Sequence, residues 1–169
     1  ASRLLSACEE AELTEESPPE LRALLWCLRG KVATLGAEGR GAPDAEALLA
    51  DAVKLDPSLA DAWNCLGECF WHRNDLEMAR HTFLGALSHE RTPATLCHLS
   101  MLLRTLASVK QAEAPALLEE SVTLAKEAVR RDARSAAAWK GLGCAHMAVY
   151  SQIAHSAEEL HFATKALAQ

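Results

Sequence analysis

Apolar residues recur along this chain at helical spacing, and the clearest run lies in residues 60–73. Its apolar positions fall at i, i+3, i+4 and i+7, on one face of a helix: Trp63, Leu66, Gly67 and Phe70. A second apolar run follows, at Ala79, Phe83 and Ala86. Asn74 and Asp75 separate the runs and predict a turn that caps the second helix. The pattern therefore predicts two antiparallel helices in contact, with the glycine allowing their close approach.

The same pattern returns 76 residues later, where Trp139 and the segment 136–143 match Trp63 and the segment 60–67. This offset corresponds to two periods of about 34 residues with some insertion. The order W-x2-L-G-x2-aromatic, then A-x3-F, is typical of the tetratricopeptide repeat. We therefore expect an all-α fold, a right-handed superhelical solenoid of tetratricopeptide helix-turn-helix repeats. The Trp, Leu, Gly and Ala positions are interpreted as packing residues.

The remaining segments can be aligned to this unit, although less closely. We expect a lone N-terminal helix in 1–18 and a single repeat domain, 1–169, with repeats at 19–57, 58–92, 93–133 and 134–169. Repeat 1 has a Gly-rich insertion at Gly36–Gly41, and repeat 3 has one near Ser108–Pro115. Pro93 after Thr92 predicts a helix start, because proline is tolerated in a first helical turn. Repeat 4 ends within a helical pattern, so we expect the chain to be part of a longer protein.

Composition and charge narrow the function classes. Apolar residues make up 50% of the chain and aromatic residues only 5%, which favours helices packed through small side chains. The net charge of −6, without clustered basic residues, disfavours direct nucleic-acid binding. There is neither a membrane-spanning apolar run nor a secretion signal. The six cysteines form no CxxC pair and are interpreted as reduced thiols. We expect a soluble protein of the cytoplasm and nucleus.

In such arrays the first helix of each repeat lines a concave groove, where peptides bind. If Trp63 is the fourth residue of its repeat, helical geometry directs positions two, five, nine, twelve and thirteen inward. The predicted inner residues are Asp61, Asn64, Glu68, Trp71 and His72, then Cys97, Met101, Arg104 and Thr105, then Lys140, Cys144 and Met147, with Lys31 in repeat 1. From these we predict the peptide-binding residues Arg104, Asn64, Glu68, Trp71, Lys140 and Lys31.

Arg104 is the strongest candidate among them, because its guanidinium falls among apolar neighbours on the predicted inner face. There it can make a bidentate contact to a peptide carboxylate. Trp71 is a candidate aromatic platform beside it. The alternative is that Arg104 pairs with Glu68 or reaches solvent.

Beyond the generic repeat, several stretches resemble the tetratricopeptide repeat protein 5 (Strap) family. They are Ala52-Val53-Lys54-Leu55-Asp56-Pro57, Ala62-Trp63-Asn64-x-Leu66-Gly67-Glu68, Phe83-x-Gly85-Ala86-Leu87 and Leu99-Ser100-Met101-x-Leu103-Arg104. The resemblance spans most of residues 20–169 and is densest from 48 to 104. It implies a longer protein with further repeats and an oligonucleotide-binding-like β-barrel.

The same resemblance implies an adaptor function. Members of the family are stress-responsive partners of a nuclear acetyltransferase co-activator complex. They also read the nascent N-terminus of tubulin at the ribosome and trigger tubulin mRNA decay. The family's groove arginine, which contacts the acidic nascent peptide, matches Arg104. Its acidic groove residues lie in later repeats, so this chain would hold only part of the site.

Other function classes fit the sequence less well. Cys65, Cys69 and His72 lie on one helix and suggest a structural zinc or thiol site, but three ligands leave a zinc tetrahedron incomplete. The chain lacks a GxSxG elbow and a phosphate-binding glycine loop, so we expect no enzyme activity and no cofactor. A co-chaperone clamp would need several polar groups on consecutive inner faces, where only Asn64, Arg104 and Lys140 are available. A protein-binding adaptor is therefore preferred.

Overall fold

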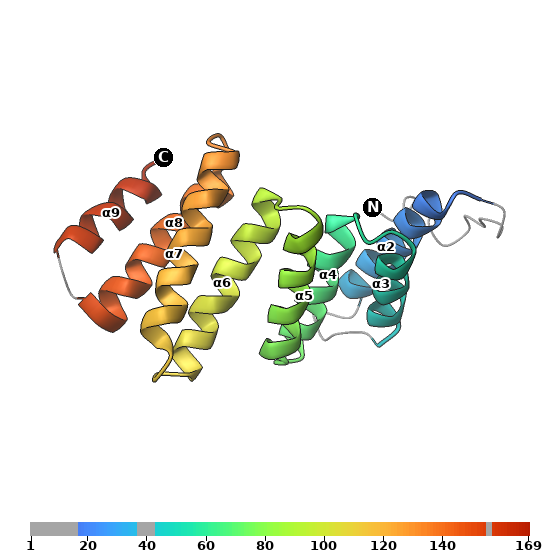
Figure 1. Ribbon diagram of the computed structural model, residues 1–169, viewed down its shortest axis with the longest axis horizontal. Coiled ribbons are helices and arrows are strands. Elements are labelled where there is room, and N and C mark those ends of the chain that lie inside the picture. The colour runs from blue at the N-terminus through green and yellow to red at the C-terminus, as the bar shows by residue number, and fades with distance from the viewer. Residues whose placement is uncertain (1–16, 37–42, 155–156) are drawn as a thin grey trace. The chain divides into compact units, whose positions relative to one another are not determined.

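The computed structural model describes residues 17–36, 43–154 and 157–169 of the chain, and every regular element in these ranges is helical (Figure 1). The helices are α2 (Pro19–Gly36), α3 (Pro43–Leu55), α4 (Ala60–His72), α5 (Leu76–His89), α6 (Pro93–Val109), α7 (Ala114–Arg131), α8 (Ala136–Val149), the short π-helix η1 (Tyr150–Ala154) and α9 (Ala157–Leu167). The predicted helix before Pro18, and most of the Gly-rich insertion, lie outside the described residues. The predicted all-α fold is confirmed.

The chain divides into two compact units, Ala1–Glu90 and Arg91–Gln169. The first unit contains α2 to α5, and the second contains α6 to α9. The division falls close to the predicted boundary between repeats 2 and 3. The finer repeat boundaries, and the single repeat domain, remain predictions.

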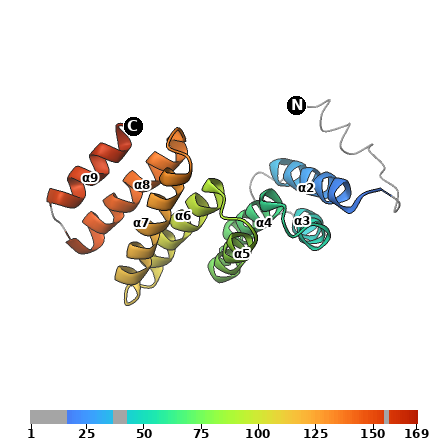
Figure 2. The same cartoon turned by 45° about the horizontal axis from the view of Figure 1, so that its top comes forward.

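Within each unit the helices pack as successive hairpins. In the first unit α2 pairs with α3 and α4 pairs with α5, and α4 also contacts both helices of the preceding hairpin. In the second unit α6 pairs with α7 and α8 with α9, and α8 contacts both α6 and α7 (Figures 1 and 2). The first helices of neighbouring hairpins therefore touch in each unit, which is the packing expected of a tetratricopeptide stack.

The residues predicted to form the turn before α5 and to start α5 and α6 do so. Asn74 adopts a left-handed backbone conformation, with φ of 61°, and Asp75 caps α5 by accepting a hydrogen bond from the Met78 backbone N–H at 3.2 Å. Thr92 caps α6 in the same way, ahead of Pro93 in the first turn. Short polar side chains thus satisfy helix N–H groups that would otherwise lack acceptors.

The two signature tryptophans make the same contact in their respective units. The Trp63 indole Nε1 donates to the Pro57 carbonyl at 2.8 Å, and the Trp139 Nε1 donates to the Ala133 carbonyl at 2.9 Å. Both side chains are half-buried, so each ring packs on the core while its polar edge ties down the turn before its helix. The repeat seen in the sequence is therefore a repeat in structure as well.

The insertion predicted near Ser108–Pro115 takes an unexpected form. The helix α6 continues to Val109, and α7 begins at Ala114, so only a short turn separates them. The extra residues lengthen this hairpin to helices of 17 and 18 residues, whereas α4 and α5 have 13 and 14. The predicted inner-face residue Arg104 lies on the longer helix α6.

Candidate functional site

In the first unit, the predicted inner residues come from α2 and α4, which touch. Lys31 Nζ on α2 lies 2.8 Å from Asp61 Oδ2 on α4 and forms an ion pair. Burial is the largest influence on the pKa of Lys31 and lowers it, but the hydrogen bond to Asp61 and the electrostatic effects of Cys65, Cys27 and Asp61 together leave the pKa raised. Lys31 therefore already has a carboxylate partner within the protein.

Asn64 is the buried member of this predicted set, with 5% of its surface exposed. Its Oδ1 atom is buried and accepts no hydrogen bond from any described residue. An unpaired buried amide oxygen costs free energy, since it has lost its hydration without gaining a donor. Glu68 and Trp71, further along α4, are both half-buried.

The proposed zinc ligands on α4 do not converge. The Cys65 thiol hydrogen-bonds the Cys27 thiol of α2, which raises the pKa of Cys65 and lowers that of Cys27. Cys69 is buried in the core of the first unit, and the His72 ring Nδ1 bonds the Glu68 carbonyl at 2.7 Å. Within the described ranges, no group of three or more His, Cys, Asp or Glu side chains is placed to hold a metal ion. The zinc alternative therefore finds no support there.

In the second unit, Arg104 lies half-buried on α6. Its Nη1 donates to the Ser100 hydroxyl at 3.1 Å, one helical turn earlier, and more weakly to the Gly141 carbonyl of α8 at 3.5 Å. Within the described part of this unit, no carboxylate pairs with the guanidinium. Arg104 is thus held at the contact between two first helices without an acidic partner from its own unit.

Two thiols flank this guanidinium. Burial is the main influence on the pKa of Arg104 and lowers it, while Cys144 and Cys97 act in the opposite direction. Burial likewise raises the pKa of Cys97, and Arg104 partly offsets this effect. The structure therefore brings the predicted inner residues Cys97, Arg104 and Cys144 together.

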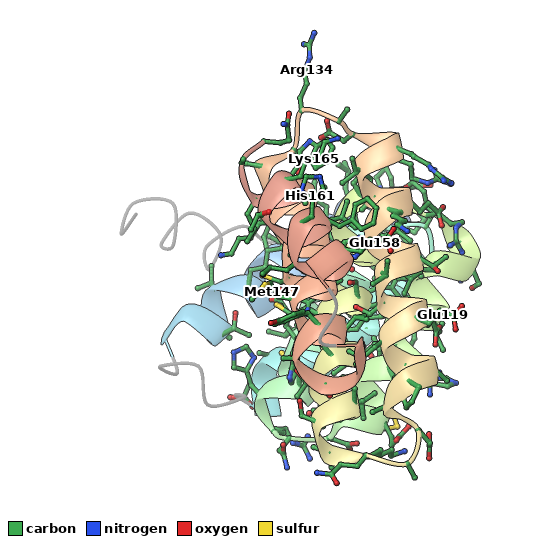
Figure 3. The ribbon with its side chains drawn as sticks, turned by 90° about the vertical axis from the view of Figure 1, so that its left-hand side faces the viewer. Glu119, Arg134, Met147, Glu158, His161 and Lys165 are labelled. Carbon is green, nitrogen blue, oxygen red and sulfur yellow. The ribbon has the colours of Figure 1, made fainter. Side chains whose placement is uncertain are left out.

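Three of the other predicted inner residues of this unit are exposed, and Thr105 on α6 is half-buried. Met101 on α6 and Met147 on α8 are 45% and 39% exposed, and Lys140 is exposed one residue before the carbonyl that Arg104 contacts. In Figure 3, Met147 lies on the opposite side of the second unit from Glu119 of α7. We call the surface formed by Met101, Arg104, Lys140 and Met147 the α6–α8 face. It combines two cations with two flexible apolar side chains.

Two serines that support Arg104 were not predicted from the sequence. Ser100 and Ser121 are both fully buried, and their side chains join α6 to α7. The sequence signal was present, because Ser100 occupies the position at which the other first helices have glycine. A polar residue at a packing position marks a local exception to the repeat pattern.

None of the described helices combines the length and the hydrophobicity that crossing a membrane requires. No protein-family model matches the chain.

Three curated relatives match it, all of them tetratricopeptide repeat protein 5. The human protein is 35% identical over 143 residues, which covers 80% of this chain and 32% of the relative. The mouse protein is 38% identical over 139 residues, covering 82% and 31%, and the bovine protein is 34% identical over 146 residues, covering 82% and 33%. The predicted resemblance is confirmed, and the chain spans about a third of the length of the relatives it matches.

Proposed function

Because this chain is a tetratricopeptide-repeat chain similar to part of tetratricopeptide repeat protein 5, we propose that it is a protein-binding adaptor that takes an acidic peptide on its α6–α8 face. Arg104 is the anchor for a carboxylate of that peptide. The name of these relatives describes a repeat class of interaction modules, which supports binding over catalysis. In this proposal the chain itself catalyses nothing and needs no cofactor.

The single observation that carries the proposal is the half-buried guanidinium without an acidic partner in its own unit. Arginine keeps its charge in proteins, so burial of Arg104 costs solvation that two neutral acceptors only partly replace. An incoming carboxylate supplies a charge-assisted hydrogen bond at this position. Lys31 is a weaker candidate, because Asp61 already neutralises it.

The surroundings of Arg104 suggest what else the peptide contains. Met101 and Met147 offer exposed, adaptable apolar surface, which suits an apolar peptide side chain. Lys140 adds a second positive charge on the same face. A short peptide with a carboxylate next to apolar side chains fits this chemistry.

By resemblance, two partners are proposed for the longer protein: the nascent N-terminus of tubulin, in tubulin mRNA autoregulation, and an acetyltransferase co-activator complex, in the stress response. The corresponding locations are the cytoplasm and the nucleus. Both partners are proteins, which agrees with the interaction role of the relatives' repeat class.

The test is a titration of a labelled tubulin N-terminal peptide into the wild-type chain and the Arg104→Ala variant. Loss of one charge-assisted contact is expected to weaken binding about 10- to 100-fold. The matched control is Arg134→Ala, because Arg134 projects from the exposed turn before α8 (Figure 3). It removes the same charge elsewhere in the unit and should leave affinity unchanged. If both variants weakened peptide binding equally, the effect would come from the overall charge of the protein and not from a specific site at Arg104.

Two further arms separate the alternatives. A chaperone C-terminal peptide that binds more tightly than the tubulin peptide would favour the co-chaperone reading over ours. Circular dichroism of Arg104→Ala should show unchanged helicity, and a loss of helicity would make the residue structural.

A further inference from the structure

Three hairpins follow one packing rule at the contact between their two helices. The first helix has a glycine there, and a large side chain of the second helix occupies the space where its Cβ would be. The pairs are Gly30 with Leu49, Gly67 with Phe83, and Gly143 with Leu167. A Cβ on each glycine would lie within 2.6 Å of an atom of its partner. At this point of each hairpin a large apolar side chain therefore packs directly against the glycine of the first helix.

The α6–α7 hairpin breaks this rule. Ser100 stands where the others have glycine, and Ser121 faces it from α7, both with no exposed surface. The Ser100 hydroxyl donates to the Ser121 carbonyl at 2.9 Å, and the Ser121 hydroxyl donates to the Ser100 carbonyl at 2.9 Å. A reciprocal pair of buried hydrogen bonds replaces the glycine and the large side chain.

This arrangement leaves the Ser100 hydroxyl oxygen able to accept a hydrogen bond from Arg104. When each hydroxyl gives its proton to the opposite carbonyl, the Ser100 oxygen keeps lone pairs that accept from Arg104 Nη1 at 3.1 Å. A glycine at this position would offer no acceptor. The exception to the packing rule thus occurs on the helix that carries Arg104, one turn before it.

We propose that Ser100, held in place by Ser121, is the positioning residue for Arg104. It fixes one edge of the guanidinium against α6 and leaves the remaining N–H groups for a ligand carboxylate. This inference rests on the proposed function, because it assigns Ser100 a part in the same site. Pre-organisation of this kind raises affinity by reducing the conformational entropy lost on binding.

The experiment is a double-mutant cycle on the full chain. The wild type, Ser100→Ala, Arg104→Ala and the double variant are titrated with the labelled tubulin N-terminal peptide and with the same peptide in which amides replace its acidic side chains. Loss of one positioning hydrogen bond should weaken binding of the acidic peptide about threefold to tenfold. Ser100→Ala should not change binding of the amide peptide, and it should not change binding of either peptide in the Arg104→Ala background. If Ser100 were merely structural, Ser100→Ala would weaken binding of both peptides in both backgrounds.

Two controls keep the inference falsifiable. Ser121→Ala breaks half of the reciprocal pair but leaves the Ser100 oxygen in place, so its effect should be smaller than that of Ser100→Ala. In nitrogen-15 spectra of arginine side chains, the Arg104 Nη1 protons should exchange slowly with water in the wild type and faster in Ser100→Ala.

The outcomes separate the two proposals. If Arg104→Ala leaves affinity for the acidic peptide unchanged, the proposed function fails, while the exchange measurement still tests positioning. If Arg104→Ala weakens binding but a folded Ser100→Ala binds like the wild type, the positioning role is overturned. If Ser100→Ala does not fold, the wild type alone tests the positioning role. Rapid exchange of the Arg104 Nη1 protons with water in the wild type would then overturn that role.

Discussion

Single residues on the first helices determine how closely two helices approach and what lies between them. Gly67 shows the apolar solution, in which the Phe83 ring fills the space above the helix backbone. Ser100 shows the polar one, in which two hydroxyls cross-link the backbones of α6 and α7. The polar pair excludes a large side chain but gives Arg104 an acceptor. One position in the repeat thus contributes to stability in one hairpin and supports the candidate site in another.

Gly67→Ala is expected to destabilise the protein. The new Cβ would lie 2.6 Å from the ring of Phe83, which is fully buried and has little room to move. Overpacking costs about 1–3 kcal/mol, while the better helix propensity of alanine returns about 0.5–1 kcal/mol. A net loss of up to about 2.5 kcal/mol should appear as a lower midpoint in denaturant unfolding.

Gly141→Ala is the matched control, because a Cβ there meets only the Cys97 sulfur at 3.9 Å. That is an ordinary contact distance, so the helix-propensity gain should dominate and the variant should be at least as stable as the wild type. The packing explanation would be contradicted if both alanines shifted the midpoint in the same direction.

At the scale of elements, the helices could be predicted from the sequence, but the residues that hold Arg104 in place could not. The caps Asp75 and Thr92 could be predicted because capping is local chemistry that follows from the nearest residues. The lengthening of α6 and α7 could not be predicted, because a proline at position 115 suggested a loop. In the structure Pro115 falls in the first turn of α7, where a helix tolerates it. Arg104 could be predicted as a candidate from its register and the family motif. Ser121 could not, because its role depends on which residue of α7 faces Ser100.

An ion-pair network ties the segment before α6 to the end of α7 and should make stability depend on pH. Glu127 accepts hydrogen bonds from Arg91 at 2.9 and 2.6 Å and from Arg131 at 3.0 Å. Arg91 is the main reason that the pKa of Glu127 falls from 4.5 to about 2. A depressed carboxyl pKa stabilises the folded state above the unfolded pKa, and this contribution is lost as the pH falls toward 2.

The corresponding variant is Glu127→Gln. Because the arginines are partly exposed, we expect the loss in unfolding free energy at neutral pH to be only about 1 kcal/mol. The difference from the wild type should shrink between about pH 5 and pH 2. The control is Glu119→Gln, which removes a carboxylate at an exposed position on the same helix, outside this network (Figure 3). A difference for Glu127→Gln that stays constant with pH would contradict the assignment of the ion pair.

At the scale of the whole molecule, the chain consists of two compact units, and each buries its own core. The core of the first unit includes buried residues of α2, α3 and α4, and that of the second includes buried residues of α7, α8 and α9. All contacts described for Arg104 lie in the second unit. A site within one unit can therefore keep its geometry when the other unit is perturbed, provided that the units open independently.

Phe83→Ala tests that independence. Phe83 is fully buried in the first unit, and its truncation should cost about 3–5 kcal/mol. If each unit is held by its own core, amide hydrogen exchange should accelerate strongly in α2 to α5 and much less in α6 to α9. The neighbouring Leu84, which is 43% exposed, provides the control, since Leu84→Ala removes a similar side chain without opening the core. Equal acceleration in both units would instead indicate one cooperative repeat domain, and Phe83→Ala would then weaken peptide binding at Arg104 by raising the fraction of unfolded protein.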